Sequence, residues 1–279
     1  MMTSNNRAAI ADTLSKVPAV TLGFWVIKIF ATTLGETAGD SVTMTWLGET
    51  TTNPMGSAHI GYLIGTGILI VPLILLVAAQ IRARAFHPLL YWATIIASTT
   101  AGTTLADFCT RFLGEGTNAS YALGSAILLT CVLATLASWR AIMGTVSVES
   151  VREPKAEMFY WATITFSQTL GTALGDWTAD SAIMGHQIGF TGGALSFGAA
   201  LAVVALLHCR TTLSRAALFW AAFILTRPLG ATVGDVLDKP HANGGLDFSR
   251  PVASLALFAA IAVCLWTFPQ RPATADAGH

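Results

Sequence analysis

Charged residues are scarce in this chain of 279 residues, of which only 11% are Asp, Glu, Lys or Arg. A soluble domain usually carries about 25% charged residues. Hydrophobic residues make up 53% of the chain, and the mean hydropathy is +0.62. Windows of about 20 residues with few charges recur, and this length allows a helix to cross a bilayer. The sequence therefore predicts an integral membrane protein in contact with lipid.

Cysteine is also rare, and its spacing excludes two common kinds of site. The four cysteines stand alone, without a Cys-x-x-Cys pair or the Cys/His spacing of a zinc site. Neither a zinc site nor a disulfide framework is predicted, and we expect the cysteines to pack as small apolar residues. The basic residues are scattered and the formal net charge is zero, so no nucleic-acid partner is expected. Without a Ser/His/Asp spacing or a phosphate-binding loop, we expect neither an enzyme nor a resident cofactor.

Four aspartates occur in one repeated setting, with a tryptophan 15 residues before and a glycine five residues before the aspartate. The residue directly before each aspartate is glycine or alanine. The aspartates are Asp40, Asp107, Asp176 and Asp235, and the glycines are Gly35, Gly102, Gly171 and Gly230. Agreement at three positions in four segments indicates a fourfold repeat. Each copy puts a carboxylate near or inside an apolar stretch, where an ionised group is costly.

The repeat is long enough for two spanning helices, because successive aspartates are 67, 69 and 59 residues apart. The predicted helices cover residues 17–40, 58–80, 88–112, 119–139, 158–181, 187–208, 215–237 and 250–268. We expect an all-α polytopic membrane protein with about eight transmembrane helices, built from four parallel two-helix repeats. These repeats cover approximately residues 17–82, 87–140, 157–210 and 215–268 of a single transmembrane domain, residues 1–279.

Basic residues are distributed unevenly between the two predicted sides of the membrane. Ten of the 15 fall on one side: Arg7, Lys16, Arg82, Arg84, Arg140, Arg152, Lys155, Arg210, Arg215 and Arg271. Cytoplasmic loops are rich in Lys and Arg, so both termini are predicted to be cytoplasmic. The repeat tryptophans would lie near this interface, where aromatic belts are common. The aspartates would lie about 22 Å further along the helix, in the outer half of the membrane or at its edge.

Oxygen-bearing side chains share a helix face with the aspartates, at the positions four, seven and eleven residues earlier. These side chains are Glu36, Thr33, Thr100, Thr103, Thr165, Thr169 and Thr172. Repeat four departs from the pattern, with Ala231 and Pro228. Carboxylate and hydroxyl oxygens are ligands of hard cations, and they also suit a proton relay. The alternative is that each aspartate ends its helix at the surface, hydrated and inert.

Small residues and two basic residues complete the motif helices. The small pairs are Gly35/Gly39, Gly102/Ala106, Gly171/Gly175 and Gly230/Gly234. Such pairs let helix backbones approach closely, either to bring the oxygens together or simply as helix packing. Lys28 and Arg227 lie well within the motif helices. We expect them to pair with the repeat acids and compensate their charge, and snorkelling to an interface is the alternative.

Further acids and histidines follow the motif helices on the outer side. They are Glu49, His59, Glu115, Asp180, His186, Asp238, His241 and Asp247. They either form a vestibule that attracts cations or belong to solvated loops.

The segments TTLGETAGD (32–40), TTAGTTLAD (99–107), QTLGTALGD (168–176) and RPLGATVGD (227–235) resemble a known bacterial family. It comprises membrane proteins defined by a short repeat of unknown function, and the resemblance covers essentially the whole chain. It implies a multi-pass protein of the bacterial inner membrane and no particular mechanism. Repeat one is also loosely similar to the Glu-x-Gly-Asp motif of cation/proton exchangers, with one residue more between Glu36 and Asp40.

The acids of the repeats predict a transporter of a small cation, most readily a divalent metal such as manganese, coupled to protons. The expected ion ligands are Glu36, Asp40, Asp107, Asp176 and Asp235. The threonines would add neutral oxygens. A passive cation or small-solute channel is one alternative, and a non-transporting membrane sensor or assembly partner is another. The expected partners are the lipid bilayer, the cation and protons, and the sequence is compatible with a homo-oligomer.

Overall fold

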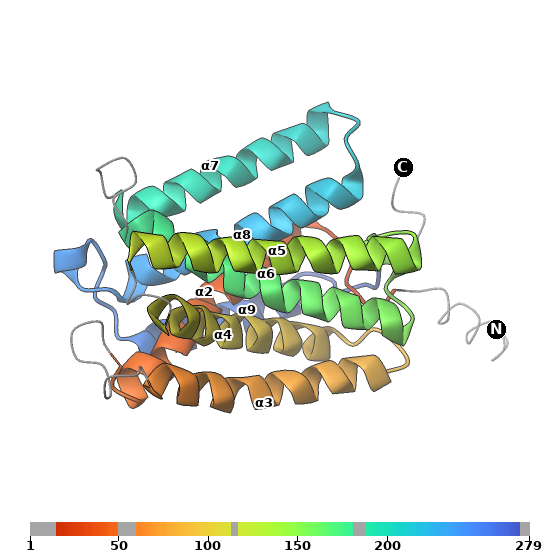
Figure 1. The fold of residues 1–279 in the computed structure, drawn as a ribbon. Helices are drawn as coiled ribbons and strands as arrows, with labels where there is room; N and C mark the ends of the chain where they lie inside the picture. Colours follow the sequence, from red (N-terminus) through yellow and green to blue (C-terminus); the bar gives the residue numbers. More distant parts are fainter. Residues whose placement is uncertain (1–14, 50–59, 113–116, 181–187, 274–279) are drawn as a thin grey trace, which may run out of the picture.

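The structure is a computed structural model that describes residues 15–49, 60–112, 117–180 and 188–273. Eight long helices occur in these ranges (Figure 1). They are α2 (Leu22–Asp40), α3 (Ile60–Arg82), α4 (Pro88–Phe112), α5 (Asn118–Met143), α6 (Pro154–Asp180), α7 (Gly189–Arg210), α8 (Arg215–Asp238) and α9 (Arg250–Thr267). Three short helical segments are η1 (Ser41–Trp46), η2 (Val148–Ser150) and η3 (His241–Asn243). The eight predicted helices are confirmed, with ends that differ by a few residues.

Local sequence signals begin and end several of these helices. The Thr21 side chain accepts a hydrogen bond from the Phe24 N–H at the start of α2. Ser214 caps α8 in the same way by accepting from Ala217. Both satisfy N–H groups that have no partner within the helix. At the other end of a helix, Gly144 adopts a positive φ of 76° and stops α5, a conformation that glycine reaches without strain.

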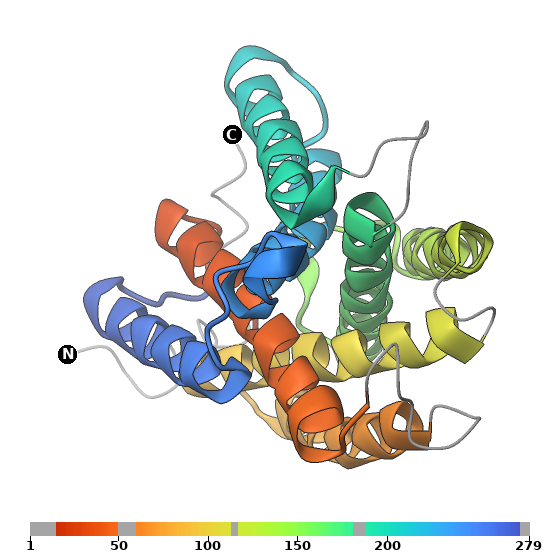
Figure 2. The ribbon, with the colours of Figure 1, turned by 90° about the vertical axis from the view of Figure 1, so that its left-hand side faces the viewer.

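The four helices that carry the repeat motif form an inner ring. Helices α2, α4, α6 and α8 each pack against the next one, and α8 packs against α2 to close the ring. The other helices lie outside this ring, with α3 on α4, α5 on α6, α7 on α8 and α9 on α2. Each outer helix thus covers the inner helix of the following repeat, which gives a pinwheel when the bundle is seen end-on (Figure 2).

The repeat glycines allow the inner helices to approach each other closely. A Cβ atom on Gly35 would overlap the Thr99 side chain, and one on Gly230 would overlap Thr32. The same contact joins every neighbouring pair of inner helices: Gly35 with Thr99, Gly102 with Gln168, Gly171 with Arg227 and Gly230 with Thr32. One turn further, Gly39, Gly175 and Gly234 face Thr103, Ala231 and Glu36. The cyclic order of these contacts shows that four copies of one helix pairing build the ring.

Every fourth residue before the repeat aspartate is buried inside the ring. The residues 16 before it are Phe24, Tyr91, Tyr160 and Phe219, and those 12 before it are Lys28, Ile95, Ile164 and Phe223. The residues eight before it are Thr32, Thr99, Gln168 and Arg227, and those four before it are Glu36, Thr103, Thr172 and Ala231. With the aspartates themselves, these layers fill the ring from one end to the other.

Aromatic side chains close the end of the ring that lies nearest the two termini. Each aromatic residue 16 before an aspartate packs on the tryptophan of the next repeat, and the ring centroids are 5.5–6.1 Å apart. The pairs are Phe24 with Trp92, Tyr91 with Trp161, Tyr160 with Trp220 and Phe219 with Trp25. The hydroxyl oxygens of Tyr91 and Tyr160 are 2.6 Å apart.

The tryptophans differ from the prediction of an interfacial belt. Trp92, Trp161 and Trp220 are at most 4% exposed, because each is covered by the aromatic residue of the preceding repeat. Two of their indole N–H groups donate to the chain that covers this end. Trp92 donates to Gln270 at 3.0 Å, and Trp220 donates to the Val146 carbonyl at 2.9 Å.

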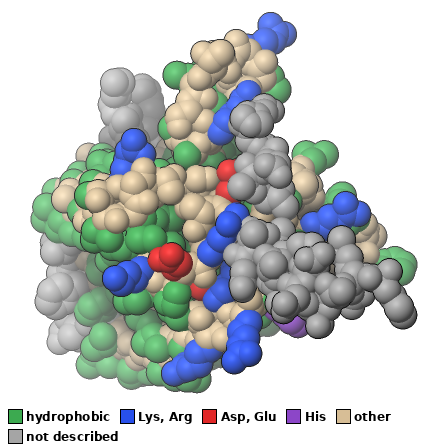
Figure 3. Space-filling model, turned by 90° about the vertical axis from the view of Figure 1, so that its right-hand side faces the viewer, with side chains coloured by type: hydrophobic (Ala, Val, Ile, Leu, Met, Phe, Trp, Pro, Cys, Tyr) green, Lys and Arg blue, Asp and Glu red, His purple; other side chains and the backbone are tan. Residues whose placement is uncertain are grey.

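The outer surface has the character of a lipid-facing surface. Large apolar side chains on the outer helices are more than half exposed, including Leu75, Leu133, Leu206 and Leu255. Within the described ranges, α3, α5, α7, α8 and α9 are long and apolar enough to cross a membrane. The more polar α2, α4 and α6 are covered by other helices. The chain is therefore a multi-pass membrane protein, and Lys and Arg side chains gather at the end that holds its termini (Figure 3).

Candidate functional site

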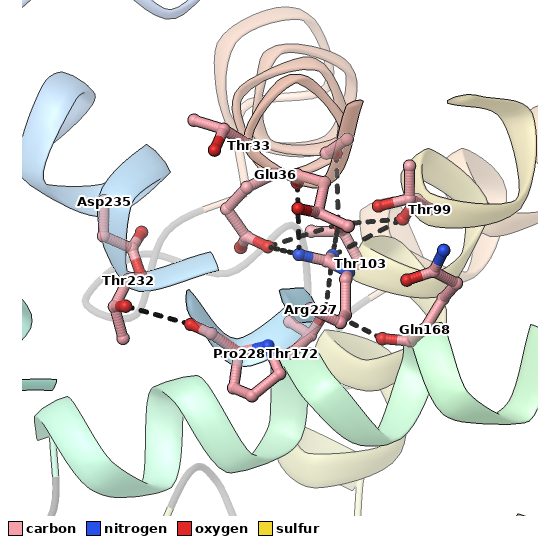
Figure 4. A network of polar contacts seen from close by, with 12 residues as sticks. Thr33, Glu36, Thr99, Thr103, Gln168, Thr172, Arg227, Pro228, Thr232 and Asp235 are labelled. Carbon is pink, nitrogen blue, oxygen red and sulfur yellow. Dashed lines mark hydrogen bonds and ion pairs between the residues drawn. The ribbon is translucent and has the colours of Figure 1, made fainter. Parts of the chain in front are cut away.

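Arg227 lies eight residues before Asp235, and its guanidinium reaches the middle of the ring at the level of the residues four before the aspartates. Its guanidinium donates to Glu36 Oε2 at 2.9 Å, to Thr103 Oγ1 at 2.5 Å and to Thr172 Oγ1 at 2.6 Å (Figure 4). One arginine from the fourth repeat thus binds the equivalent position of each of the other three repeats. The fourth copy of that position is Ala231, whose small side chain has no acceptor to offer.

The surroundings of Arg227 explain how such a residue is tolerated inside the bundle. Its aliphatic stem lies against Gly171, where any side chain would overlap it. The guanidinium is fully buried, and it also approaches the carbonyl oxygens of Thr32 and Thr99 at 3.4 and 3.5 Å. A buried charge is stable only when it is paired and hydrogen-bonded. The predicted pairing of Arg227 with a repeat acid is therefore present in the structure, with Glu36 as the partner.

Three carboxylates converge beside Arg227. One oxygen each of Glu36, Asp40 and Asp235 lies within 4.8 Å of the others. All three side chains are at most 2% exposed, although α2 and α8 lie at opposite ends of the sequence. We call these three residues the acid cluster. Its carboxylate oxygens are a ligand set that hard divalent cations prefer.

An ammonium group already binds to the acid cluster. Lys239 Nζ is 2.7 Å from Asp40 Oδ2 and 3.0 Å from Asp235 Oδ1. Arg250 Nε lies farther away, at 3.8 Å from Asp40 and 3.5 Å from Asp238. The second oxygen of Asp40, Oδ1, is buried and has no hydrogen-bond partner among the described residues. The cluster therefore holds one cation and retains acceptor capacity.

The other two repeat aspartates belong to the same layer but not to the acid cluster. Asp107 is 4% exposed, and its Oδ2 has no hydrogen-bond partner in the described ranges. Both Asp107 and Asp176 lie close enough to Arg111 to interact with its charge. Arg111 in turn stacks over the Tyr62 ring at 5.2 Å. The four repeat aspartates are thus not equivalent, because Asp40 and Asp235 bind Lys239 whereas Asp107 and Asp176 interact with Arg111.

The predicted threonine ligands also fall into two groups. Thr103 and Thr172 bind Arg227, as described above. Thr33, Thr100 and Thr169 donate instead to carbonyl oxygens of their own helices, at 2.8–3.0 Å. Thr165 does the same. These hydroxyls lie seven or eleven residues before the aspartate, whereas the stripe inside the ring repeats every four residues. The structure therefore places them beside the site rather than in its hydrogen-bond network.

Lys28 does not pair with a repeat acid, so the prediction of its role is wrong. Its Nζ lies 4.0 Å from the centroid of the Phe223 ring and has no hydrogen-bond partner among the described residues. It is fully buried, so it does not snorkel to an interface either. The residues level with it are apolar, and Glu36 is two helical turns away and occupied by Arg227.

Several residues of the site were not assigned a role from the sequence. Lys239 lies four residues after Asp235, a spacing at which opposite charges attract on a helix, and this was the available signal. The contact of Lys239 with Asp40 had no local signal, because the two residues are 199 positions apart. Of the predicted outer acids and histidines, Asp238 joins the site through Arg250. His59, Glu115 and His186 lie outside the described residues, as does the side chain of Asp180.

The fold and the repeats agree with one known family. The repeat of unknown function DUF347 matches residues 23–86, 90–145, 159–214 and 218–271. The chain belongs to this family. Each DUF347 repeat contains one inner helix and the outer helix that follows it. No curated protein matches the chain. No solved structure matches it.

Proposed function

We propose that this DUF347 protein transports a small cation across the membrane, preferentially a divalent metal such as manganese, in exchange for protons. The observation that supports this most is the convergence of the Glu36, Asp40 and Asp235 carboxylates inside a ring of membrane helices. Acids at such a depth are costly. A role in binding and moving a cation accounts for their position.

The charge around the site supports a cation rather than an anion as the substrate. Lys239 shows that the acid cluster accepts a positive group at hydrogen-bond distance. Buried oxygens on Asp40 and Asp107 remain without hydrogen-bond donors among the described residues. Neighbouring carboxylates repel each other when all are ionised, so protons are suitable exchange partners when the metal leaves.

The packed interior of the ring supports a carrier rather than an open pore. Between the acid cluster and the termini, an ion would meet Arg227, Lys28 and then the aromatic layer. All of these side chains are buried. Passage therefore requires the inner helices to rearrange, as in alternating access. The passive channel is the weaker alternative, because a channel needs a continuous open path through the ring, and these buried side chains fill that path.

Transport is tested with purified protein in liposomes that contain a manganese-sensitive dye and a pH-sensitive dye. External Mn²⁺ should enter wild-type vesicles, and proton movement in the opposite direction should accompany it. Asp40→Asn and Asp235→Asn each remove one charge from the acid cluster and should abolish entry. Asp247→Asn is the matched control, because Asp247 is exposed and its positive φ of 58° is one that asparagine tolerates.

Equal Mn²⁺ entry in wild type, Asp40→Asn and Asp235→Asn would refute the proposal, as would no entry in any sample. Entry that follows the membrane voltage without proton movement would instead identify a channel.

A further inference from the structure

Lys239 closes the exposed side of the acid cluster. Its side chain is 17% exposed, whereas Asp40 and Asp235 are 1% and 2% exposed. Its Nζ bridges these two carboxylates, one from the first repeat and one from the fourth. A cation that approaches the acid cluster from this side therefore meets an ammonium group in the position where it would itself be bound.

The charges of the cluster suit a divalent ion once the ammonium has left. Glu36 is already paired with Arg227 at 2.9 Å. Asp40 and Asp235 then carry two negative charges between them, of which Lys239 neutralises one. With Lys239 displaced, the two carboxylates balance one divalent cation. Arg250 is the other basic side chain at hand, and it lies nearer to Asp238 than to Asp40.

The position of Lys239 in the chain allows its side chain to leave without unfolding a helix. Lys239 is the residue directly after α8, and its N–H still bonds to the Asp235 carbonyl at 2.9 Å. The following segment folds back on the end of α8 through bonds from Leu246 and Phe248 to Val236 and Leu237. The backbone is thus held in place. The lysine side chain is a flexible four-carbon stem that can rotate outwards on its own.

We propose that Lys239 is a tethered competitor that occupies the cation site and lowers its apparent affinity for a divalent ion. This inference rests on the proposed function. A monovalent cation that displaces Lys239 gains no charge over the ammonium it replaces. A divalent cation gains one unit of charge and satisfies the free oxygen of Asp40. A cation can bind only when Lys239 has left the site. Its apparent affinity is therefore the intrinsic affinity of the open site multiplied by the fraction of protein in which the lysine is displaced.

Equilibrium binding of Mn²⁺ to the full-length protein tests the competition. Free Mn²⁺ is measured from its electron paramagnetic resonance signal, with wild type, Lys239→Gln, Lys239→Arg and the exposed control Lys155→Gln. Lys239→Gln should lower the Mn²⁺ dissociation constant about tenfold, the effect of 1.4 kcal/mol in binding free energy. Lys239→Arg keeps the positive charge and should stay close to wild type, as should Lys155→Gln.

A second measurement uses the wild-type protein, so it does not depend on whether a variant folds. An amine-acylating reagent is applied with and without saturating Mn²⁺, and modified lysines are quantified by mass spectrometry. Acylation of Lys239 should become severalfold faster with Mn²⁺, while that of Lys155 should not change.

The outcomes separate this inference from the proposed function. If wild type binds Mn²⁺ and Asp40→Asn does not, but Lys239→Gln binds like wild type, the competition is refuted and the site stands. Unchanged or slower acylation of Lys239 with Mn²⁺ also refutes the competition. If no protein binds Mn²⁺, both proposals fail.

Discussion

Glu36→Gln should destabilise the helix ring, because it removes the carboxylate that neutralises Arg227. The guanidinium is fully buried, and Glu36 is the acid bound to it, at 2.9 Å. Removing one partner of a buried ion pair typically costs about 3–5 kcal/mol in the free energy of unfolding, since the other charge is left uncompensated. Thr103 and Thr172 still bind the guanidinium, so we expect about 3 kcal/mol, a fall in Tm of roughly 6 °C.

The double variant Glu36→Gln/Arg227→Met distinguishes this charge effect from a general loss of packing. Replacing both partners by groups of similar size is often neutral or stabilising. The Tm of each protein is measured in the same detergent by tryptophan fluorescence. Arg227→Met is measured as the second single variant. The double variant should regain most of the stability that Glu36→Gln loses, so its loss should be smaller than the sum of the two single losses. Additive losses, or an unchanged Tm in Glu36→Gln, would refute the central position of this ion pair.

Two further predictions concern the packing of the inner helices and the buried lysine between them. Gly230→Val should prevent the ring from closing, because a side chain there overlaps Thr32, and size-exclusion chromatography should show loss of the monodisperse protein. Gly67→Val is its control, since a Cβ there meets nothing within 4 Å, and equal behaviour of the two would contradict the expectation. Lys28→Met should leave Tm unchanged or raise it, because the ammonium forms no hydrogen bond with described residues and lies over Phe223. A fall of several degrees would indicate a partner for Lys28.

The sequence was sufficient to predict the repeats and the long helices, because both depend on local patterns. Apolar runs of spanning length predicted helices such as α4, which begins and ends as expected. The repeated glycines predicted close helix contacts but not which helices meet. That α8 packs on α2, and so brings Asp235 to Asp40, follows from the closure of the ring.

The face of each helix that lies inside the ring was predicted only in part. On an isolated straight helix, residues four, seven and eleven before the aspartate share its face. Rows of residues four apart run at an angle to the helix axis, and they follow the centre of the ring only where the packed helices are tilted. This tilt is a property of the tertiary structure. It explains why Thr103 and Thr172 bind Arg227 inside the ring, whereas Thr33 and Thr100 bond to carbonyl oxygens of their own helices.

Lys28 and Lys239 show the same limit for charged residues. A basic residue within an apolar helix was expected to find an acid, and for Arg227 this holds. Lys28 lies eight residues before Glu36 on the same helix, so its ammonium lies at the level of apolar side chains instead. The lysine that binds the acids, Lys239, directly follows α8. Its spacing of four residues from Asp235 was a local signal for that pair, whereas its contact with Asp40 depends on the packing of α8 against α2.

The most direct test of the acid cluster as a cation site is Mn²⁺ binding by purified protein. It is measured side by side for wild type, Asp40→Asn, Asp235→Asn and Asp247→Asn. We expect wild type and Asp247→Asn to bind a single Mn²⁺ per chain, and both cluster variants to lose it while they keep their fold. Unaltered binding in Asp40→Asn and Asp235→Asn would place the metal elsewhere and contradict the account.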